Sequence, residues 1–367
     1  MRNFSDQRST SSFVATQHQS ESNLNLRKAL EDEFPLDGTK TEQLKFLLNY
    51  AVLAPSSHNT QPWQFSIVND AIDLYADRTR ALPSADPNNR ELIISCGAAL
   101  FHLRIAIRHF GYSDLVEILP EQNQPSLLAR IRLGSKRVVR LEENFLFRAI
   151  GRRYTNRLSF EDCQLPKSLQ SELETACCSE GNYLQIATQI IPETIRQEVV
   201  NLIVAGDRLQ MSDPSFRQEL SQWIHSSNSH DGITAQAQGL SRRLDPLAPL
   251  IAFAVRSFDL GESQADKDYR LAIAAPVLMS IFSNGDTAED WIATGEALAH
   301  LLLRARVDNV WASFFNQPIQ VPQLRSRLQA LFPNNGYPQI ILRLGYAKET
   351  GATPRRSVEE VLNEVDA

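Results

Sequence analysis

The sequence predicts an α+β fold in which mixed, largely antiparallel sheets are flanked by helices. Helical patterns of apolar residues alternate with short apolar strands along the chain. In addition, Asn69-Asp70-Ala71 forms a short polar connection that is typical of a β-hairpin. The chain has 367 residues, of which 43% are hydrophobic and 22% charged. That length and composition predict two units, or one large unit, with a full-sized core.

The first unit is expected at residues 26–140, after a polar segment at 1–25 that has no apolar period and is expected to be a disordered tail. Asp86 followed by Pro87 predicts the start of a long helix, because Asp caps helices and Pro suits the first helical position. Small residues at 95–99 predict that this helix lies in the middle of the fold. The expected elements are a helix from Thr39, strands at 65–68 and 72–75, a helix from Asp86 to about Phe110, and strands near 114–119 and 128–133.

The second unit is expected at residues 141–367. Its segment 225–266 has no clear pattern, and so long a break in a compact protein predicts a lid or an insertion. We expect Trp223 and Phe253 to anchor this lid. The expected elements are helices at 142–150, 167–178, 288–307 and 322–331, long helices across 192–224, and strands at 183–189, 277–282, 310–313 and 338–344.

Composition narrows the function classes. The formal net charge of −6 argues against nucleic-acid or anionic-membrane binding. No apolar run reaches the length of a membrane span, and no secretory signal is present, so we expect a cytoplasmic protein. The adjacent Cys177 and Cys178 are expected to be buried apolar residues, and His225 and His230 solvated loop residues, so no metal site is expected. Motifs of Rossmann dehydrogenases, P-loop enzymes, zincins and α/β-hydrolases are absent.

The run from Ala54 to Trp63, with the sequence APSSHNTQPW, crowds short polar side chains between two prolines at the end of a helix. Such a loop offers hydrogen-bond groups with little freedom to move, as a planar, polar-edged ligand requires. The alternative is a helix that Pro55 terminates, followed by an Asx turn before a strand.

Two basic motifs concentrate positive charge in an otherwise acidic chain. The run at 151–157, GRRYTNR, contains three arginines, and Pro354-Arg355-Arg356 follows the last expected strand. Guanidinium groups match phosphate oxygens bidentately, so both motifs are candidates for binding an anion. The alternatives are a helix C-terminus that attracts cations, surface ion pairs, and a solvated tail.

These three motifs, in this order, resemble those of the nitroreductase family, and the R-R-x-T-N-R form resembles its divergent Acg-like branch. The resemblance implies a nitroreductase-like fold and bound FMN, with no catalytic side chain because the flavin N5 carries the chemistry. Tyr154 departs from the family pattern, in which Ser is usual. The implied cofactor-binding residues are Pro55, Ser56, Ser57, Asn59, Gln61, Arg152, Arg153, Asn156, Arg157, Arg355 and Arg356.

The motifs are divided between the two halves of the chain. In the family, one subunit of a dimer supplies the polar loop and the other supplies the basic motifs. Here the loop lies only in the first half and the basic motifs only in the second. We therefore expect an internal duplication in which one chain imitates the dimer, so that a monomer suffices for the site. A dimer of the whole chain stays open.

The resemblance implies an FMN-dependent oxidoreductase that takes hydride from NAD(P)H and passes it to a nitroaromatic, a quinone or a similar acceptor. A flavin-binding or flavin-storage protein, with a lid that blocks NAD(P)H turnover, is the alternative. A structural domain with vestigial motifs is a third interpretation. The sequence selects neither the acceptor nor the nucleotide.

Overall fold

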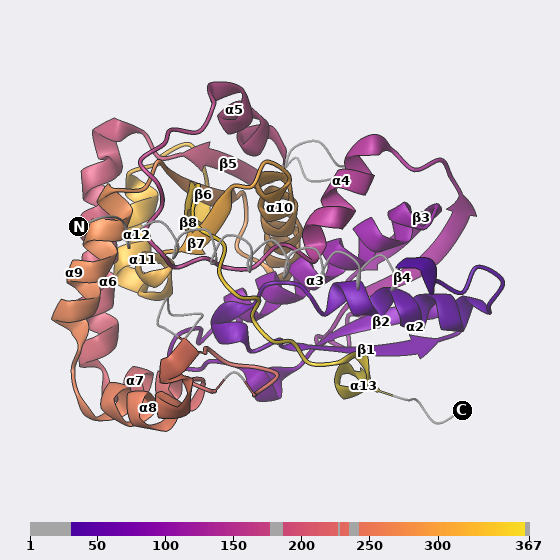
Figure 1. The fold of residues 1–367 in the computed structure, drawn as a ribbon, viewed down its shortest axis with the longest axis horizontal. Helices are drawn as coiled ribbons and strands as arrows, with labels where there is room; N and C mark the ends of the chain where they lie inside the picture. Colours follow the sequence, from indigo (N-terminus) through magenta and orange to yellow (C-terminus); the bar gives the residue numbers. More distant parts are fainter. Residues whose placement is uncertain (1–30, 177–185, 227, 235–241, 364–367) are drawn as a thin grey trace, which may run out of the picture.

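The computed structural model describes residues 31–176, 186–226, 228–234 and 242–363. Two largely antiparallel sheets lie on either side of a pair of long central helices, α3 (Arg90–His109) and α10 (Ala288–Val307) (Figure 1). The expected α+β class with largely antiparallel sheets is confirmed. The predicted tail at 1–25 and the Cys177-Cys178 pair lie outside the described residues.

The two sheets repeat one topology. The first sheet has the order β3-β4-β2-β1 and the second has β5-β6-β8-β7, with every one of these neighbours antiparallel. In each half the central helix follows the second strand, so the order of elements also repeats. The strands are β1 (Trp63–Val68), β2 (Ala71–Ala76), β3 (Tyr112–Ile118), β4 (Leu127–Lys136), β5 (Ile186–Ile190), β6 (Val277–Ser283), β7 (Trp311–Phe314) and β8 (Tyr337–Gly345).

The C-terminal segment joins the two halves. After β8 the chain crosses to the first sheet, where β9 (Leu362–Asn363) pairs in parallel with β1 (Figure 1). The short helix α13 (Val358–Val361) places Val358 and Val361 in the core of the first half. The first sheet is therefore completed by residues from the other end of the chain.

Close packing of the central helices explains the small residues at 95–99. A Cβ atom added at Gly97 would lie 2.2 Å from the carbonyl oxygen of Ile292, and one at Gly295 would lie 2.0 Å from that of Ile94. Backbone atoms therefore touch at the crossing, and only glycine fits at either position. Helix α3 is long and apolar enough to cross a membrane, but 83% of that window is buried inside the protein.

The remaining helices flank the sheets, and four of them form an insertion between β5 and β6 that has no counterpart between β1 and β2. The insertion holds α6 (Glu193–Ser212), α7 (Pro214–Gln222), α8 (Ala248–Ser257) and α9 (Gly261–Ile273). The others are α2 (Lys40–Ala51), α4 (Leu141–Ile150), α5 (Lys167–Thr175), α11 (Gln317–Gln320) and α12 (Pro322–Ala330), with 3₁₀ turns η1 (Ser57–Asn59), η2 (Arg78–Arg80) and η5 (Arg242–Leu247).

Two sequence predictions are corrected. The long helix begins at Arg90 rather than at Pro87, with Asn89 as its N-cap, although both Asp86 carboxylate oxygens still accept backbone N–H groups of its first turn at 2.9 Å. The segment 225–266 is not irregular, because η5, α8 and the start of α9 occupy its second part. Its apolar residues escaped a helical reading because the outer face of α8 is also apolar, with Phe253 51% exposed. Phe253 is therefore not an anchor.

Candidate functional site

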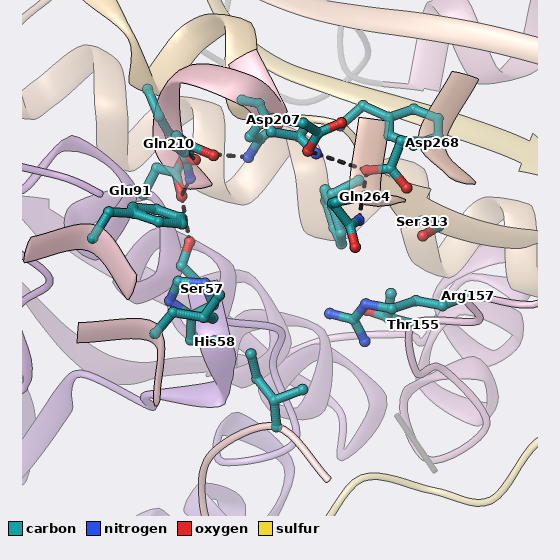
Figure 2. A pocket seen from close by; sticks show the side chains of 18 of the residues that line it. Ser57, His58, Glu91, Thr155, Arg157, Asp207, Gln210, Gln264, Asp268 and Ser313 are labelled. Carbon is teal, nitrogen blue, oxygen red and sulfur yellow. Dashed lines mark hydrogen bonds between the residues drawn. The ribbon is translucent and has the colours of Figure 1, made fainter. Parts of the chain in front are cut away.

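A cavity of about 450 Å³ lies between the two halves, within the size range of small-molecule sites. The first half contributes the loop 55–58 and the first turns of α3. The second half contributes Thr155 and Arg157, residues of β7 and β8, and one wall from the insertion. Figure 2 shows Ser57 and His58 on one side of the cavity, Thr155 and Arg157 opposite them, and Asp207 with Asp268 along the insertion wall.

The predicted loop has a strained backbone. His58, Asn59 and Gln61 all have positive φ values, of 49°, 55° and 49°, which non-glycine residues seldom adopt. Hydrogen bonds hold this conformation: the Gln61 N–H donates to Ser56 Oγ at 2.9 Å, and Ser57 Oγ donates to Glu91 Oε2 at 2.6 Å. Strain of this kind often occurs where a loop is shaped for a ligand.

Pro55, Ser56 and Ser57 of the predicted loop line the cavity, whereas the described contacts of Asn59 and Gln61 point to another role. Asn59 Nδ2 donates to the carbonyl oxygens of Gly232 and Pro354, at 3.1 and 3.2 Å. Gln61 Nε2 donates to the His230 carbonyl at 2.8 Å, and its Oε1 accepts the Arg356 N–H, also at 2.8 Å. These two buried amides therefore join the loop to the segment after α7 and to the C-terminal crossing.

The residues of the 151–157 run have different surroundings in the structure. Arg157 lines the cavity, and Arg153 is 6% exposed and donates through Nη2 to the Leu53 carbonyl at 3.1 Å. Arg152 is only partly buried and contacts the Asn309 side chain, away from the cavity. Asn156 is fully buried, and its side chain bonds the Lys348 carbonyl and the Leu158 N–H. We therefore assign Arg152 to the surface and Asn156 to the internal structure.

Arg355 and Arg356 of the C-terminal motif also have different contacts. Arg355 Nε donates to the Ala54 carbonyl at 3.2 Å, next to the start of the predicted loop. Arg356 contacts the Gln61 and Glu360 carbonyls instead. Thus Arg153 and Arg355, from separate parts of the chain, meet at Leu53 and Ala54.

Arg153 and Arg355 form an unneutralised pair of cations. Burial lowers the pKa of Arg153 to about 9, with a further contribution from Arg355, and burial lowers the pKa of Arg355 to about 10. Neither forms an ion pair within the described residues, and the buried Arg153 Nε has no hydrogen-bond partner there. Buried cations without an acid are costly, and an anionic ligand group would relieve that cost. Their surroundings fit the phosphate of a nucleotide-like cofactor.

Among the cavity residues that sequence reasoning missed are His58 and Arg343, whose pKa values are lowered. The pKa of His58 is lowered to about 4, chiefly by burial; the charge of Glu91 opposes the shift and the charge of Arg157 adds to it. Arg343 on β8 is 1% exposed, and its Nε and Nη1 have no partner among the described residues. His58 lies inside the predicted loop and could have been included, whereas Arg343 lies in an ordinary strand pattern. Only the tertiary structure brings it to the cavity.

Within the described residues, no cluster of three or more His, Cys, Asp or Glu side chains could hold a metal ion. His225 is instead hydrogen-bonded to Asp231, at 3.0 Å, and His230 to Glu360, also at 3.0 Å. Both bonds help to hold the segment 228–234 in place.

No family model matches the chain. It is 28% identical over 341 residues to "Putative NAD(P)H nitroreductase Rv3131" of Mycobacterium tuberculosis strain H37Rv, covering 91% of this chain and 94% of that protein. It is also 26% identical over 332 residues to "Putative NAD(P)H nitroreductase acg" of the same strain, covering 88% and 96%. In sequence the chain is therefore similar to proteins named NAD(P)H nitroreductases, and the Acg-like branch is among them. This relationship confirms the resemblance that the sequence motifs carried.

Among solved structures, the chain resembles the FMN- and NADPH-dependent nitroreductase NfnB from Sphigopyxis sp. strain HMH, with a TM-score of 0.41 and 16% identity, over 60% of this chain and 99% of that one. It also resembles NfnB from Mycobacterium smegmatis in complex with NADPH, with a TM-score of 0.39 and 15% identity, over 61% and 99%.

Proposed function

We propose that this Acg-like chain is an FMN-binding oxidoreductase of nitroreductase type, which uses NAD(P)H to reduce a nitroaromatic, a quinone or a similar acceptor. The observation that carries the proposal is the meeting of Arg153 and Arg355 beside the predicted loop. Arg153 is buried and Arg355 is partly buried, and neither forms an ion pair with an acid within the described residues. The relatives named NAD(P)H nitroreductases support it.

The cofactor would use both halves of the chain. Arg153 and Arg355 would hold the phosphate, because two guanidinium groups can neutralise a dianion. Ser56, Ser57 and Arg157 would bind the polar groups of the cofactor inside the cavity, where apolar side chains such as Phe314 and Ile233 provide a slot for a ring. Asn59, Gln61 and Arg356 would act indirectly, by holding the loop in its strained shape.

When bound, FMN supplies a ring that accepts a hydride and passes it on. The protein's own contribution is binding and electrostatics. Arg157 and Arg343 place positive charge at the cavity wall, which favours a ligand that gains negative charge on reduction. His58 stays neutral near pH 7 because its pKa is lowered, so it offers a hydrogen bond without adding another cation.

Reconstitution with FMN tests the proposal. We expect the purified protein to retain one FMN per chain, with a flavin absorbance band, and to be stabilised by about 4 kcal/mol at a thousandfold excess over the Kd. Anaerobic NADPH and NADH should each be mixed with the holoprotein in a stopped-flow instrument. Bleaching of the band by either nucleotide supports the oxidoreductase, whereas no thermal shift and no retained FMN would refute the proposal.

A flavin-storage role is the second candidate, and the contacts of residues 228–234 favour it. The N–H of Gly232 donates to the Asn59 carbonyl, and Asp231 pairs with Arg80 of η2. Together with the amide bonds from Asn59 and Gln61, these contacts fasten the segment onto the first half. A fastened cover would keep the nicotinamide ring from the flavin, and a holoprotein that NADPH does not bleach would favour this role.

We further propose that the repeated topology arose by internal duplication, with halves at 26–140 and 141–367 and the insertion as a lid over the cavity. A monomer then suffices for the site, since each half provides part of it. We retain the cytoplasm as the proposed location because NAD(P)H is the proposed reductant.

A further inference from the structure

Two carboxylates from the insertion meet in the cavity wall. Asp207 on α6 and Asp268 on α9 are 3% and 6% exposed. Gln317 of α11 bridges them, because its Nε2 donates at 2.9 Å both to Asp207 Oδ1 and to Asp268 Oδ2. Gln264 adds a second donor to Asp268 Oδ2 at 3.0 Å. All four residues line the cavity.

The pair is not fully satisfied. Asp207 Oδ2 and Gln317 Oε1 are buried and have no hydrogen-bond partner within the described residues. An isolated carboxylate oxygen in that position is costly, but a protonated one could donate a hydrogen bond. The pair therefore has the chemistry of two carboxyl groups that hold one proton between them.

The charged groups around the pair support this state. Burial and the charge of Asp268 raise the pKa of Asp207, and burial also raises the pKa of Asp268. Lys267 on α9 and Arg343 on β8 oppose the shifts, and Arg157 faces Asp268 across the cavity. These cations stabilise one negative charge, while burial disfavours a second.

We propose that Asp207 and Asp268 form the acceptor subsite of this chain, donating their shared proton in a hydrogen bond to the carbonyl or nitro oxygen of an uncharged planar acceptor. This inference rests on the proposed function. Asp268 is the member of the pair that faces the ligand. Its Oδ1 has no hydrogen bond within the described residues, and it is not completely buried, whereas Asp207 Oδ2 is. Asp207 keeps the proton in the pair by opposing a second ionisation.

The nearby aromatic and apolar residues set the class of acceptor. Phe314, Phe315 and Leu271 line the same cavity and suit a flat, apolar ring. A quinone becomes a hydroquinone by gaining a hydride and a proton. The dihydroflavin of the proposed function gives the hydride, the acid pair gives the proton to the quinone oxygen, and water returns a proton to the pair.

The test is equilibrium binding of tetramethylbenzoquinone (duroquinone) to the oxidised FMN holoprotein, measured by calorimetry at pH 6.5 and pH 9.5. Its ring positions are all methylated, so it does not alkylate the exposed Cys163. Four proteins are compared: the wild type, Asp207→Asn, Asp268→Asn, and the control Asp266→Asn, which changes an exposed carboxylate on the same helix.

We expect the wild type and the control to lose about tenfold in affinity at the higher pH, the equivalent of one hydrogen bond. Asp207→Asn should bind weakly at both pH values, since a lone Asp268 ionises beside Arg343. Asp268→Asn should bind tightly at both, because its amide donates permanently. If Asp207→Asn matches the wild type, or Asp268→Asn is folded and loses binding at both pH values, the proposal is wrong.

Stability provides an independent readout. A carboxyl group whose pKa is raised on folding stabilises the protein at low pH, and that stability is lost as the pH rises through the folded value. The thermal midpoint of the wild type should therefore fall more than that of Asp207→Asn between pH 6.5 and 9.5. The flavin absorbance of every variant is recorded first. Loss of FMN from the wild type refutes the proposed function, whereas retained FMN with unchanged quinone binding refutes only this inference.

Discussion

The two halves of the chain share a strand order and differ in the connection between their first two strands. In the first half, Asn69 and Asp70 form a tight turn between β1 and β2, both with positive φ, as short hairpins require. In the second half, the equivalent strands β5 and β6 are separated by residues 191–276, which contain α6 to α9. The same sheet topology therefore accepts either a two-residue turn or a helical insertion at this edge.

This difference shows how the site is divided. The half with the short turn contributes the strained loop and Glu91, which fix one side of the cavity. The half with the insertion contributes the acid pair and the apolar wall. The repeated sheets provide the frame, and the residues that distinguish the halves form the cavity.

The largest expected effect comes from the crossing of the two central helices, one from each half. Gly295→Ala should lower the free energy of unfolding by more than about 3 kcal/mol, because its Cβ would collide with backbone that cannot move alone. Chemical denaturation measures this loss in the free energy of unfolding. Gly97→Ala should match it, and Gly351→Ala, at an exposed glycine without positive φ, is the control. Tolerance of either central substitution would contradict the close crossing.

The second prediction separates cofactor binding from stability. Arg153→Met should weaken FMN binding by roughly tenfold to a hundredfold, since a hydrogen-bonded charge pair contributes about 1.5–3 kcal/mol. The apo-protein should be as stable as the wild type or more stable, because a buried charge without an acid is removed. Fluorescence titration with FMN and thermal denaturation measure the two effects. Arg152→Met is the matched control, and equal FMN affinity in both variants would exclude Arg153 from the site.

A smaller effect is expected where the loop of one half is fastened to the lid of the other. Asn59→Ala removes the hydrogen bonds to Gly232 and Pro354 and should cost about 1–3 kcal/mol of stability. Limited proteolysis near residue 232 should become faster. Unchanged proteolysis would show that the amide does not hold this segment. Asn49→Ala, which loses a single bond within α2, is the control.

The smallest effect concerns the neutral histidine of the loop. The folded pKa of His58 is about 4, below its ordinary value, so the unfolded chain binds more protons between the two values. Its contribution to stability is present above the ordinary histidine pKa and is lost as the pH falls toward 4. His58→Asn should therefore lose less stability than the wild type between pH 7 and pH 5, measured by thermal midpoints. His230→Asn, at an exposed histidine, is the control, and equal losses in all three proteins would contradict the shift.

Local rules accounted for much of the fold. The helix 288–307 matches its sequence prediction because a capping box at Thr287 and Asp290 starts it. The helix 86–110 was predicted to begin too early, because Asp86 caps its first turn from outside the helix. The apolar residues of α8 gave no readable pattern, since much of its apolar surface faces outward.

The sequence by itself determined the α+β class, the division of motifs between the halves, and the chemistry that points to a flavin. It determined these because hydrophobic periodicity, capping residues and short polar motifs act over a few neighbouring positions. Only the tertiary structure decided which motif arginines lie near the site: Arg157 lines the cavity, and Arg153 and Arg355 meet beside the loop, whereas Arg152, Asn156 and Arg356 have other contacts. It also brought Arg343, Asp207 and Asp268 to the site. Burial and the approach of distant charges give these side chains their properties, and neither is encoded in local spacing.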